Sequence, residues 1–155
     1  MNIIKLDAIN STNDYLKGLL QRQFVENFTI ITAENQTNGR GQMGSEWKIE
    51  SGKNLTFSVL IKDLLLEINH IFHLNVAVAV SIIETLSELE IKDCAIKWPN
   101  DILAEGKKVG GVLIENSIKS DGEIFSIIGI GLNVNQKSFQ NLPKASSLSV
   151  LKNCD

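Results

Sequence analysis

The stretch Gln36-Thr-Asn-Gly-Arg-Gly-Gln-Met-Gly-Ser-Glu-Trp47 holds the most informative cluster of residues in the chain. Three glycines at the spacing G-x-G-x-x-G enclose Arg40, one of two arginines in the protein. Glycine at this density lets backbone amides approach an anionic ligand closely. The arginine adds a planar, permanently charged group that suits a carboxylate or a phosphate. The stretch therefore predicts an anion-binding loop. The alternative is a flexible surface loop, and the other segments of the chain are needed to choose between the two.

The same glycine spacing marks dinucleotide-binding proteins, but its surroundings here do not fit that class. The dinucleotide fingerprint opens a helix that crosses to a parallel strand, and such a connection needs about a dozen residues or more. Ser51 and Gly52 interrupt the segment after the glycines, and the next β-rich run already begins at Leu55. Ser45-Glu46 stands where a phosphate-binding P-loop requires lysine followed by serine or threonine. Both of these nucleotide-binding motifs are therefore excluded.

Length, charge and cysteine content predict a single cytoplasmic domain. A chain of 155 residues matches the length prior for one domain. The net charge of -3 argues against a partner with a phosphate backbone, so we expect no nucleic-acid binding. Cys94 and Cys154 lack the spacing of a disulfide or zinc framework, which favours reduced thiols. No apolar run reaches the roughly 18 residues of a membrane span and no signal peptide is evident, so we expect no membrane partner.

The remaining sequence predicts an α/β (α+β) fold, a mixed β-sheet packed against helices. Apolar or β-rich runs predict strands at residues 3–6, 28–33, 55–61, 95–98, 107–115 and 123–134. Ser11-Thr12-Asn13 offers N-cap residues for a helix that continues to Leu20. Residues 71–89 predict a longer, largely buried helix, and Ser120–Gly122 predicts a hairpin turn. No further element is predicted after Gln136.

Covalent catalysis finds no support in the sequence. Neither cysteine lies in a glycine-rich turn, and no serine occupies a G-x-S-x-G elbow. His70 and His73 lie three positions apart without a nearby cysteine, which argues against zinc. What remains is a set of cations beside glycine turns, with an amide and a carboxylate between them: Arg40, Lys97, Asn100, Asp101, Lys107 and Lys108. Each lysine alone is equally consistent with a solvated surface, but together they suit a carboxylate that attacks a nucleotide α-phosphate.

Five motifs together resemble one known family. They are Ser11-Thr12-Asn13, the stretch Gln36–Trp47, Lys97-Trp-Pro-Asn-Asp101, Lys107-Lys-Val-Gly-Gly-Val-Leu-Ile-Glu115 and Gly129-Ile-Gly-Leu-Asn133. Their order and spacing are similar to those of biotin–protein ligases, from about Leu6 to Leu148. The resemblance implies a fold like that of class II aminoacyl-tRNA synthetases and biotin synthetases. It also implies that biotin is activated by ATP to biotinyl-5'-AMP and transferred to a lysine of a biotin carboxyl carrier protein, the partner domain of biotin-dependent carboxylases.

The resemblance assigns roles to individual residues. It implies a biotin site made by Ser11, Thr12, Asn13, Gln36, Gly39, Arg40, Gly41, Gln42, Lys108, Gly111, Leu113, Gly129 and Gly131. It implies a nucleotide site made by Trp47, Lys97, Asn100, Asp101 and Asn133. Lys108, Arg40 and Asp101 are the expected catalytic residues, with Lys108 between the biotin carboxylate and the α-phosphate. Mg²⁺ is expected to enter with ATP rather than on a separate protein site.

The chain departs from the family pattern in two ways. Gln42 replaces the second arginine of the usual Gly-Arg-Gly-Arg loop, which predicts looser retention of the adenylate. Residues 1–155 are expected to be the catalytic domain without an N-terminal helix-turn-helix or a C-terminal β-barrel, either a fragment or a truncated product. The alternatives are a lipoate or octanoyl ligase of the same fold, or a biotin-binding remnant without ligase activity. Relatives can dimerise through sheet edges, so a homodimer is one open oligomeric state.

Overall fold

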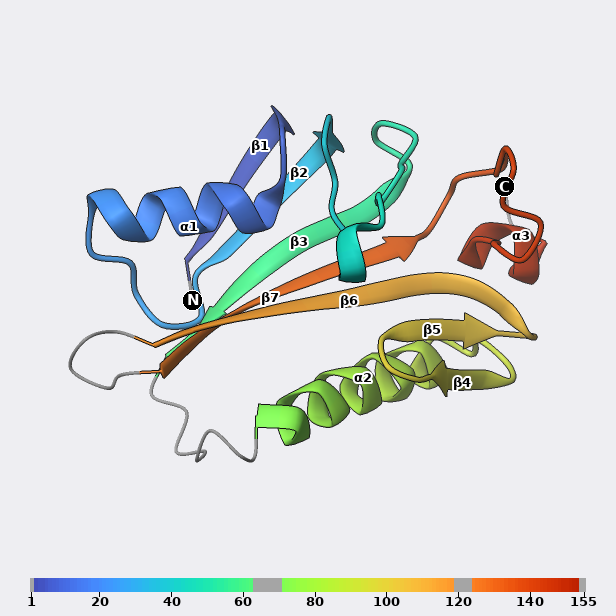
Figure 1. Cartoon of the computed structure of the whole chain (residues 1–155). Coiled ribbons are helices and arrows are strands. Elements are labelled where there is room, and N and C mark those ends of the chain that lie inside the picture. The colour runs from blue at the N-terminus through green and yellow to red at the C-terminus, as the bar shows by residue number, and fades with distance from the viewer. Residues whose placement is uncertain (1, 63–70, 119–123, 154–155) are drawn as a thin grey trace.

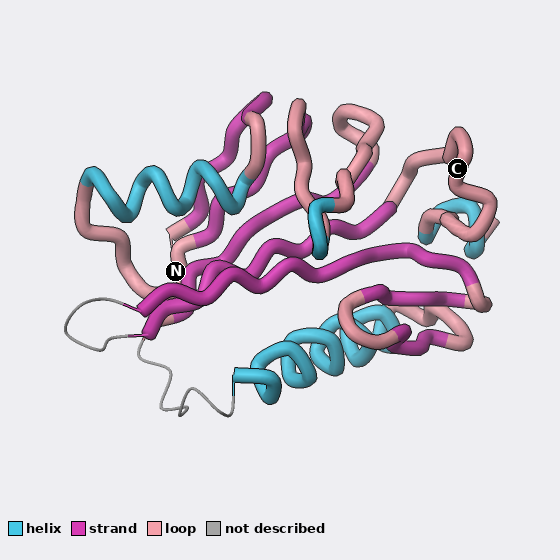
Figure 2. The backbone as a smooth tube through the Cα atoms, viewed as in Figure 1, coloured by secondary structure: helices cyan, strands magenta, loops and turns pink. Residues whose placement is uncertain are grey.

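The β-rich runs of the sequence pair into one sheet. In the computed structural model, which describes residues 2–62, 71–118 and 124–153, seven strands are present: β1 (Ile3–Ile9), β2 (Ile30–Gln36), β3 (Asn54–Ile61), β4 (Cys94–Lys97), β5 (Asp101–Ala104), β6 (Lys107–Ile118) and β7 (Ile124–Asn133). Their order is β1-β2-β3-β7-β6-β5-β4, and Figure 2 shows them as one continuous layer. β1 and β2 are parallel and all other neighbours are antiparallel, so the predicted mixed sheet is confirmed.

Two longer helices cover opposite faces of this sheet (Figure 1). α1 (Thr12–Arg22) connects the parallel strands and buries Leu16 in a cluster with Ile127. α2 (Ile71–Glu88) buries Leu86 in a second cluster with Ile128. Because consecutive side chains of a strand point to opposite faces, Ile127 and Ile128 place the two helices on different sides. One face therefore carries α1, which packs on β2, β3 and β7, and the other carries α2, which packs on β4, β5 and β6.

The beginning of α1 follows from its capping residues. The Ser11 hydroxyl accepts a hydrogen bond from the Asp14 backbone amide at 3.4 Å, as expected of an N-cap. Ser11, Thr12 and Asn13 are each only 3% exposed. Buried polar side chains require partners, so these three residues do more than cap a helix. The predicted helix is confirmed, and its first turn faces the interior.

The structure corrects the sequence predictions in three places. β5 was not predicted, because four residues between two turns carry little pattern. A short terminal helix, α3 (Leu148–Lys152), was missed for the same reason, and Ser147 caps it. The prediction of a largely buried α2 is wrong: Phe72, Val76 and Val80 are 51%, 43% and 39% exposed, because the sheet covers only one side of the helix.

Some predictions concern residues outside the described part. Ser120–Gly122, the expected hairpin turn, and His70 lie outside it. The strands on either side of the turn, β6 and β7, do pair in antiparallel register from Gly110↔Leu132 to Ile118↔Ile124. Among the described helices, none has the length and apolar character needed to cross a membrane. β1 and β4 are the two edges of the sheet, and dimerisation through an edge stays a prediction.

Candidate active site

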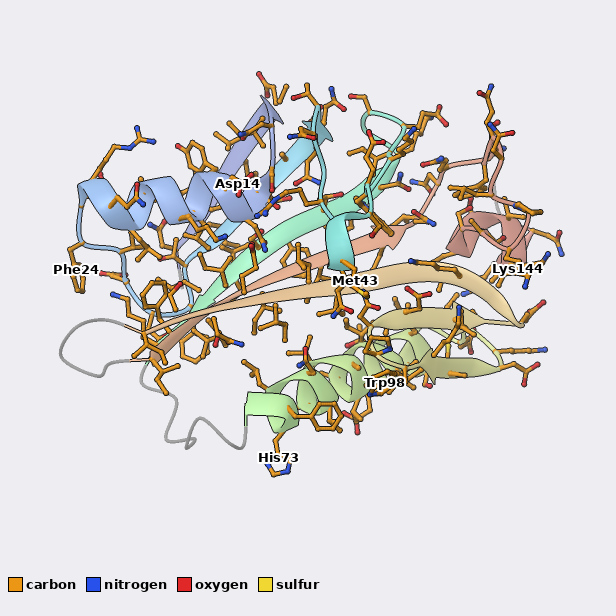
Figure 3. The ribbon with its side chains drawn as sticks, in the orientation of Figure 1. Asp14, Phe24, Met43, His73, Trp98 and Lys144 are labelled. Atoms are coloured by element: carbon orange, nitrogen blue, oxygen red, sulfur yellow. The ribbon has the colours of Figure 1, made fainter. Side chains whose placement is uncertain are left out.

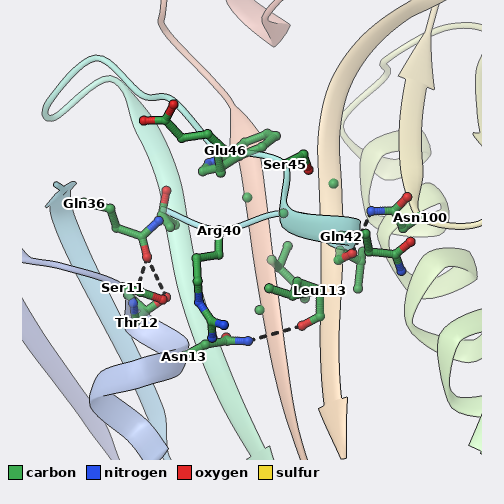
Figure 4. Close-up of a pocket in the computed structure, with 18 of the residues that line it drawn as sticks. Ser11, Thr12, Asn13, Gln36, Arg40, Gln42, Ser45, Glu46, Asn100 and Leu113 are labelled. Carbon is green, nitrogen blue, oxygen red and sulfur yellow. Dashed lines mark hydrogen bonds between the residues drawn. The ribbon is translucent and has the colours of Figure 1, made fainter. Parts of the chain in front are cut away.

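A cavity lies on the α1 face of the sheet, under the glycine loop (Figure 4). We use the name glycine loop for residues 39–47, which include the short 3-10 helix η1 (Gln42–Gly44). The cavity is enclosed by the start of α1, the end of β2, the glycine loop and the centres of β3, β6 and β7. The residues that line it are Ser11, Thr12, Asn13, Gln36, Arg40, Gly41, Gln42, Ser45, Glu46, Trp47, Thr56, Phe57, Asn100, Lys108, Gly111, Val112, Leu113, Gly129, Ile130 and Gly131.

One end of the cavity is a network of neutral polar groups. The Gln36 side-chain oxygen accepts hydrogen bonds from the Thr12 amide at 2.8 Å and from the Thr12 hydroxyl at 3.0 Å. The hydroxyl of Ser58, a fully buried residue of β3, lies 2.7 Å from Thr12 Oγ1 and 2.6 Å from Asn13 Oδ1. Because these atoms fix one another, the hydroxyls and the amide are held in place before any ligand arrives.

Two glycines of β7 allow side chains to lie directly on the sheet. A Cβ at Gly129 would lie 2.5 Å from Asn13 Oδ1, and one at Gly131 would lie 2.7 Å from Trp47 Nε1. Real side-chain carbons do not approach so closely, so any larger residue would displace Asn13 or the indole. Gly111 of β6 is the register partner of Gly131, and a Cβ at Gly111 would lie 3.6 Å from Trp47 Cζ3. The indole of Trp47 therefore lies across both strands.

The other end of the cavity carries a cation. Lys108 Nζ lies 2.6 Å from Asp101 Oδ1 and 5.8 Å from the centre of the Trp47 ring. Asp101 also faces Lys97, whose Nζ is 3.7 Å from Oδ2. The Asn100 amide donates to the Val112 carbonyl at 3.0 Å, which fixes the turn between β4 and β5 beside Gly111. The cavity thus runs from neutral hydrogen-bonding groups to a lysine.

Arg40 reaches from the glycine loop to two carboxylates. Its Nη2 donates to Asp14 Oδ1 at 2.6 Å and to Glu115 Oε2 and Oε1 at 2.9 and 3.1 Å. Lys17 Nζ lies 2.6 Å from Glu115 Oε1, and the Asn13 amide donates to Glu115 Oε2 at 2.8 Å. Burial alone would raise the pKa of Glu115, but the hydrogen bonds from Lys17 and Asn13 and the charge of Arg40 outweigh it and lower that pKa.

Three buried donor or acceptor atoms in the cavity region have no hydrogen-bond partner among the described residues. They are Arg40 Nε, Trp47 Nε1 and Thr56 Oγ1. Buried polar atoms are nearly always hydrogen-bonded, and an unpaired one costs about 1–3 kcal/mol. All three belong to residues that line the cavity. Their arrangement suits a ligand that supplies the missing partners.

The structure brings most of the expected site residues together. Fourteen of them line the cavity: Ser11, Thr12, Asn13, Gln36, Arg40, Gly41, Gln42, Trp47, Asn100, Lys108, Gly111, Leu113, Gly129 and Gly131. Asp101 is not among the lining residues but pairs with Lys108, which is, and Lys97 in turn pairs with Asp101. Gly39, the first residue of the glycine loop, is buried, and its carbonyl accepts a hydrogen bond from the Trp47 amide at 2.9 Å. Asn133 is also buried, and its amide donates to the Ser146 carbonyl at 3.1 Å.

Four residues that the sequence reasoning missed take part in the site. Ser58 and Thr56 alternate with apolar residues on β3, and the two polar positions on one face of a strand were a signal that they face a polar site. Asp14 and Glu115 pair with Arg40. Glu115 stood at the end of a quoted motif, but nothing local to either acid pointed to the glycine loop.

The chain is similar in sequence to a known protein family and to several of its members. The profile of the biotin/lipoate A/B protein ligase family matches residues 6–135. The bifunctional ligase/repressor BirA of Bacillus spizizenii is 35% identical over 138 residues, which are 88% of this chain and 42% of that protein. The biotin–acetyl-CoA-carboxylase ligase of Mycobacterium tuberculosis is 30% identical over 122 residues, which are 77% of this chain and 44% of that protein. This chain therefore spans less than half the length of these relatives.

A solved structure extends the likeness to three dimensions. The biotin protein ligase from Aquifex aeolicus in complex with biotin and ATP superposes with a TM-score of 0.82 at 32% identity, over 99% of this chain and 62% of that one. The superposition confirms the fold predicted from the resemblance, that of class II aminoacyl-tRNA synthetases and biotin synthetases. Since the family profile matches most of its residues, and residues from the five sequence motifs gather around one cavity, this chain belongs to the biotin/lipoate A/B protein ligase family.

Proposed function

We propose that this domain activates biotin with ATP to biotinyl-5'-AMP and transfers the biotinyl group to a lysine of a biotin carboxyl carrier domain. The observation that carries the proposal is the polarity of the cavity: neutral hydrogen-bonding groups at Thr12 and Gln36, a floor of glycines, and Lys108 at the far end. Biotin has the same order of groups, with a neutral ureido ring, an apolar body and a terminal carboxylate. The Mycobacterium tuberculosis and Aquifex aeolicus proteins, which match most of this chain, carry the names of biotin ligases.

The first half-reaction joins two anions. The biotin carboxylate attacks the α-phosphate of ATP, a new C–O–P linkage forms and pyrophosphate leaves. Lys108, at the cationic end of the cavity, neutralises the repulsion between carboxylate and phosphate and stabilises the charge of the transition state. For this role it exchanges its partner Asp101 for the ligand oxygens.

The second half-reaction transfers the acyl group. The neutral amine of the acceptor lysine attacks the carbonyl carbon of the adenylate, and AMP leaves with the former carboxylate oxygen. In this proposal Asp101 orients the incoming ammonium and takes its proton, and its position beside Lys108 supports that role. Trp47 and the rest of the glycine loop exclude water, which would otherwise hydrolyse the adenylate.

Magnesium fits this scheme as a companion of ATP. Across residues 2–62, 71–118 and 124–153, no group of three histidine, cysteine, aspartate or glutamate residues gathers as a metal site. Mg²⁺ commonly binds one or two carboxylates together with substrate phosphates, and Asp101 supplies a carboxylate at the cationic end of the cavity. The ion when bound would neutralise phosphate charge. We likewise propose a cytoplasmic location, where ATP and reduced thiols such as that of Cys94 are found.

Biotin-dependent exchange of pyrophosphate into ATP tests the proposal. We expect exchange with biotin and little with lipoate or octanoate. Lys108→Ala should lower the exchange rate by at least about 100-fold, the loss seen when one transition-state donor is removed. Lys92→Ala, which removes an exposed lysine that does not line the cavity, is the matched control and should keep full exchange.

The outcomes separate the alternatives. Exchange with lipoate but not biotin would make the chain a lipoate-type ligase. Biotin binding without exchange, measured by calorimetry, would make it a binding remnant. Normal exchange by the Lys108→Ala variant would remove that lysine from the mechanism.

A further inference from the structure

Within the described part of the chain, the polar contacts that join the glycine loop to other elements come from a single residue, Arg40. Its backbone hydrogen bonds stay within the loop: Gly41 to Ser45, Ser45 to Gln42, and Trp47 to Gly39, at 2.7, 3.0 and 2.9 Å. Among the described residues, the side-chain hydrogen bonds from the loop to other elements all come from Arg40. The other anchor is the packing of Trp47 on the glycines of β6 and β7.

The acceptors of Arg40 are themselves fixed. Asp14 lies in the first turn of α1, and Glu115 lies on β6 with its carboxylate held by Lys17 and Asn13. Two acids and two bases make this group electrically neutral, and the Glu115 side chain is only 20% exposed. A partly buried carboxylate with several donors is a stronger and less salt-screened partner than an ordinary surface acid. Arg40 therefore binds two carboxylates that are already held in position on two separate elements, α1 and β6.

We propose that Asp14, Lys17 and Glu115 form a latch that holds the glycine loop over the cavity through Arg40 and sets the rate at which the cavity opens. Asp14 and Glu115 act as positioning residues and do not contact the ligand. The effect of the latch on biotin release rests on the proposed function. The hold of the latch on the glycine loop does not depend on any ligand.

The composition of the loop makes its closure depend on Arg40. Gln42 is neutral, so Arg40 is the one cation between Gly39 and Trp47. With its Nη2 engaged by Asp14 and Glu115, the charge of Arg40 serves loop closure. Lys108, which exchanges its partner Asp101 for the ligand, serves the ligand anion. Opening the loop must break the Arg40 bonds, whereas the internal bonds of the loop can move with it.

Hydrogen exchange of the ligand-free protein tests the latch directly. In Asp14→Asn and Glu115→Gln variants, amides 39–47 should exchange about tenfold faster, as expected when a charge-assisted pair holding a local opening is lost. Exchange in β7 should stay unchanged and shows that the variants are folded. Lys48→Gln is the matched control, because it removes the exposed Lys48–Glu46 pair beside the same loop without touching Arg40.

Salt and ligand release complete the test. High salt should speed hydrogen exchange of the loop in the wild-type protein more than in Glu115→Gln, because salt weakens ion pairs and the variant has lost the one between Arg40 and Glu115. A contact without charge would show no such dependence on salt. Biotin should leave the two variants about tenfold faster, in step with loop opening. Wild-type exchange rates in both variants would overturn the latch. If hydrogen exchange of the loop is faster in the variants but none of the proteins binds biotin, the proposed function is rejected and the latch is kept. If the proteins bind biotin but hydrogen exchange of the loop is unchanged, the latch is rejected and the proposed function is kept.

Discussion

Gly131 shows how a single missing side chain shapes the site. It pairs with Gly111 on the neighbouring strand, and the indole of Trp47 lies against both. The sequence predicted Gly131 as a site residue from a motif, but it gave no sign that Trp47 would lie there. The residues are far apart along the chain, and only the pairing of β3, β6 and β7 brings them together.

Gly131→Ala should move the indole out of its position. The added Cβ would lie 2.7 Å from Trp47 Nε1, so the tryptophan and the loop that carries it must shift. Overpacking of this kind costs about 1–3 kcal/mol, and if that cost falls on the bound state we expect a loss of biotin affinity of about 5- to 150-fold. Tryptophan fluorescence and calorimetric titration with biotin measure the two effects.

Gly18→Ala is the control for that substitution. Gly18 lies within α1, where its added Cβ would be 3.0 Å from the end of the flexible Arg22 side chain, which can move. Alanine in a helix interior should stabilise the protein by about 0.5–1 kcal/mol, because glycine is a poor helix former. Equal losses of biotin affinity in both variants would show that the effect at Gly131 is not local.

At the scale of elements, the sequence predicted what regular patterns can reveal. Strands with apolar runs and the capped α1 were found, whereas the four-residue β5 and the five-residue α3 are too short to show periodicity. The apolar residues of α2 indicated burial on most sides, yet Phe72, Val76 and Val80 of this helix are exposed. Composition reports how apolar a helix is, but not which neighbours cover it.

Gln42→Arg tests what the glycine loop lost relative to the family pattern. Gln42 lines the cavity, and a second arginine there would add a charge-assisted bond to the adenylate phosphate. Such a bond is worth about 1.5–3 kcal/mol, so release of biotinyl-AMP should slow by about 10- to 100-fold. Stopped-flow displacement of the adenylate measures this rate.

Met43→Arg separates position from charge in the same experiment. Met43 is the next residue of the loop, but its side chain is fully exposed, with a relative accessibility of 103% (Figure 3). The same added charge there should leave the release rate close to that of the wild type. An unchanged rate in Gln42→Arg would refute the role given to this position.

At the scale of the whole molecule, the site depends on contacts that no local pattern encodes. Arg40 and Glu115 are separated by 75 positions, and Asn13 and Glu115 by 102. Motif order predicted which segments would meet, because the family resemblance carries the fold with it. It did not predict which side chains would pair, because a glutamate at the end of a strand motif has the same local sequence whether it faces solvent or Arg40.

Asn133 joins the sheet to the last part of the described chain, and this contact leads to a different expectation from its predicted nucleotide role. It is 5% exposed, and its amide donates to the carbonyl of Ser146, just before the Ser147 cap of α3. Leu148 and Leu151 then pack against the α2 core cluster. Loss of the Asn133 side chain would therefore leave a buried carbonyl without its donor and loosen the packing of the terminal segment.

Asn133→Ala should destabilise the protein by about 1–3 kcal/mol, the cost of an unpaired buried acceptor. Urea unfolding measures the loss, and hydrogen exchange should rise in residues 145–153 while β7 stays protected. Asn135→Ala, two positions along and exposed, is the matched control and should change stability by less than about 0.5 kcal/mol. If Asn133→Ala instead unfolds like the wild type and raises only the KM for ATP, the asparagine serves the nucleotide and the terminal segment is held by its leucines alone.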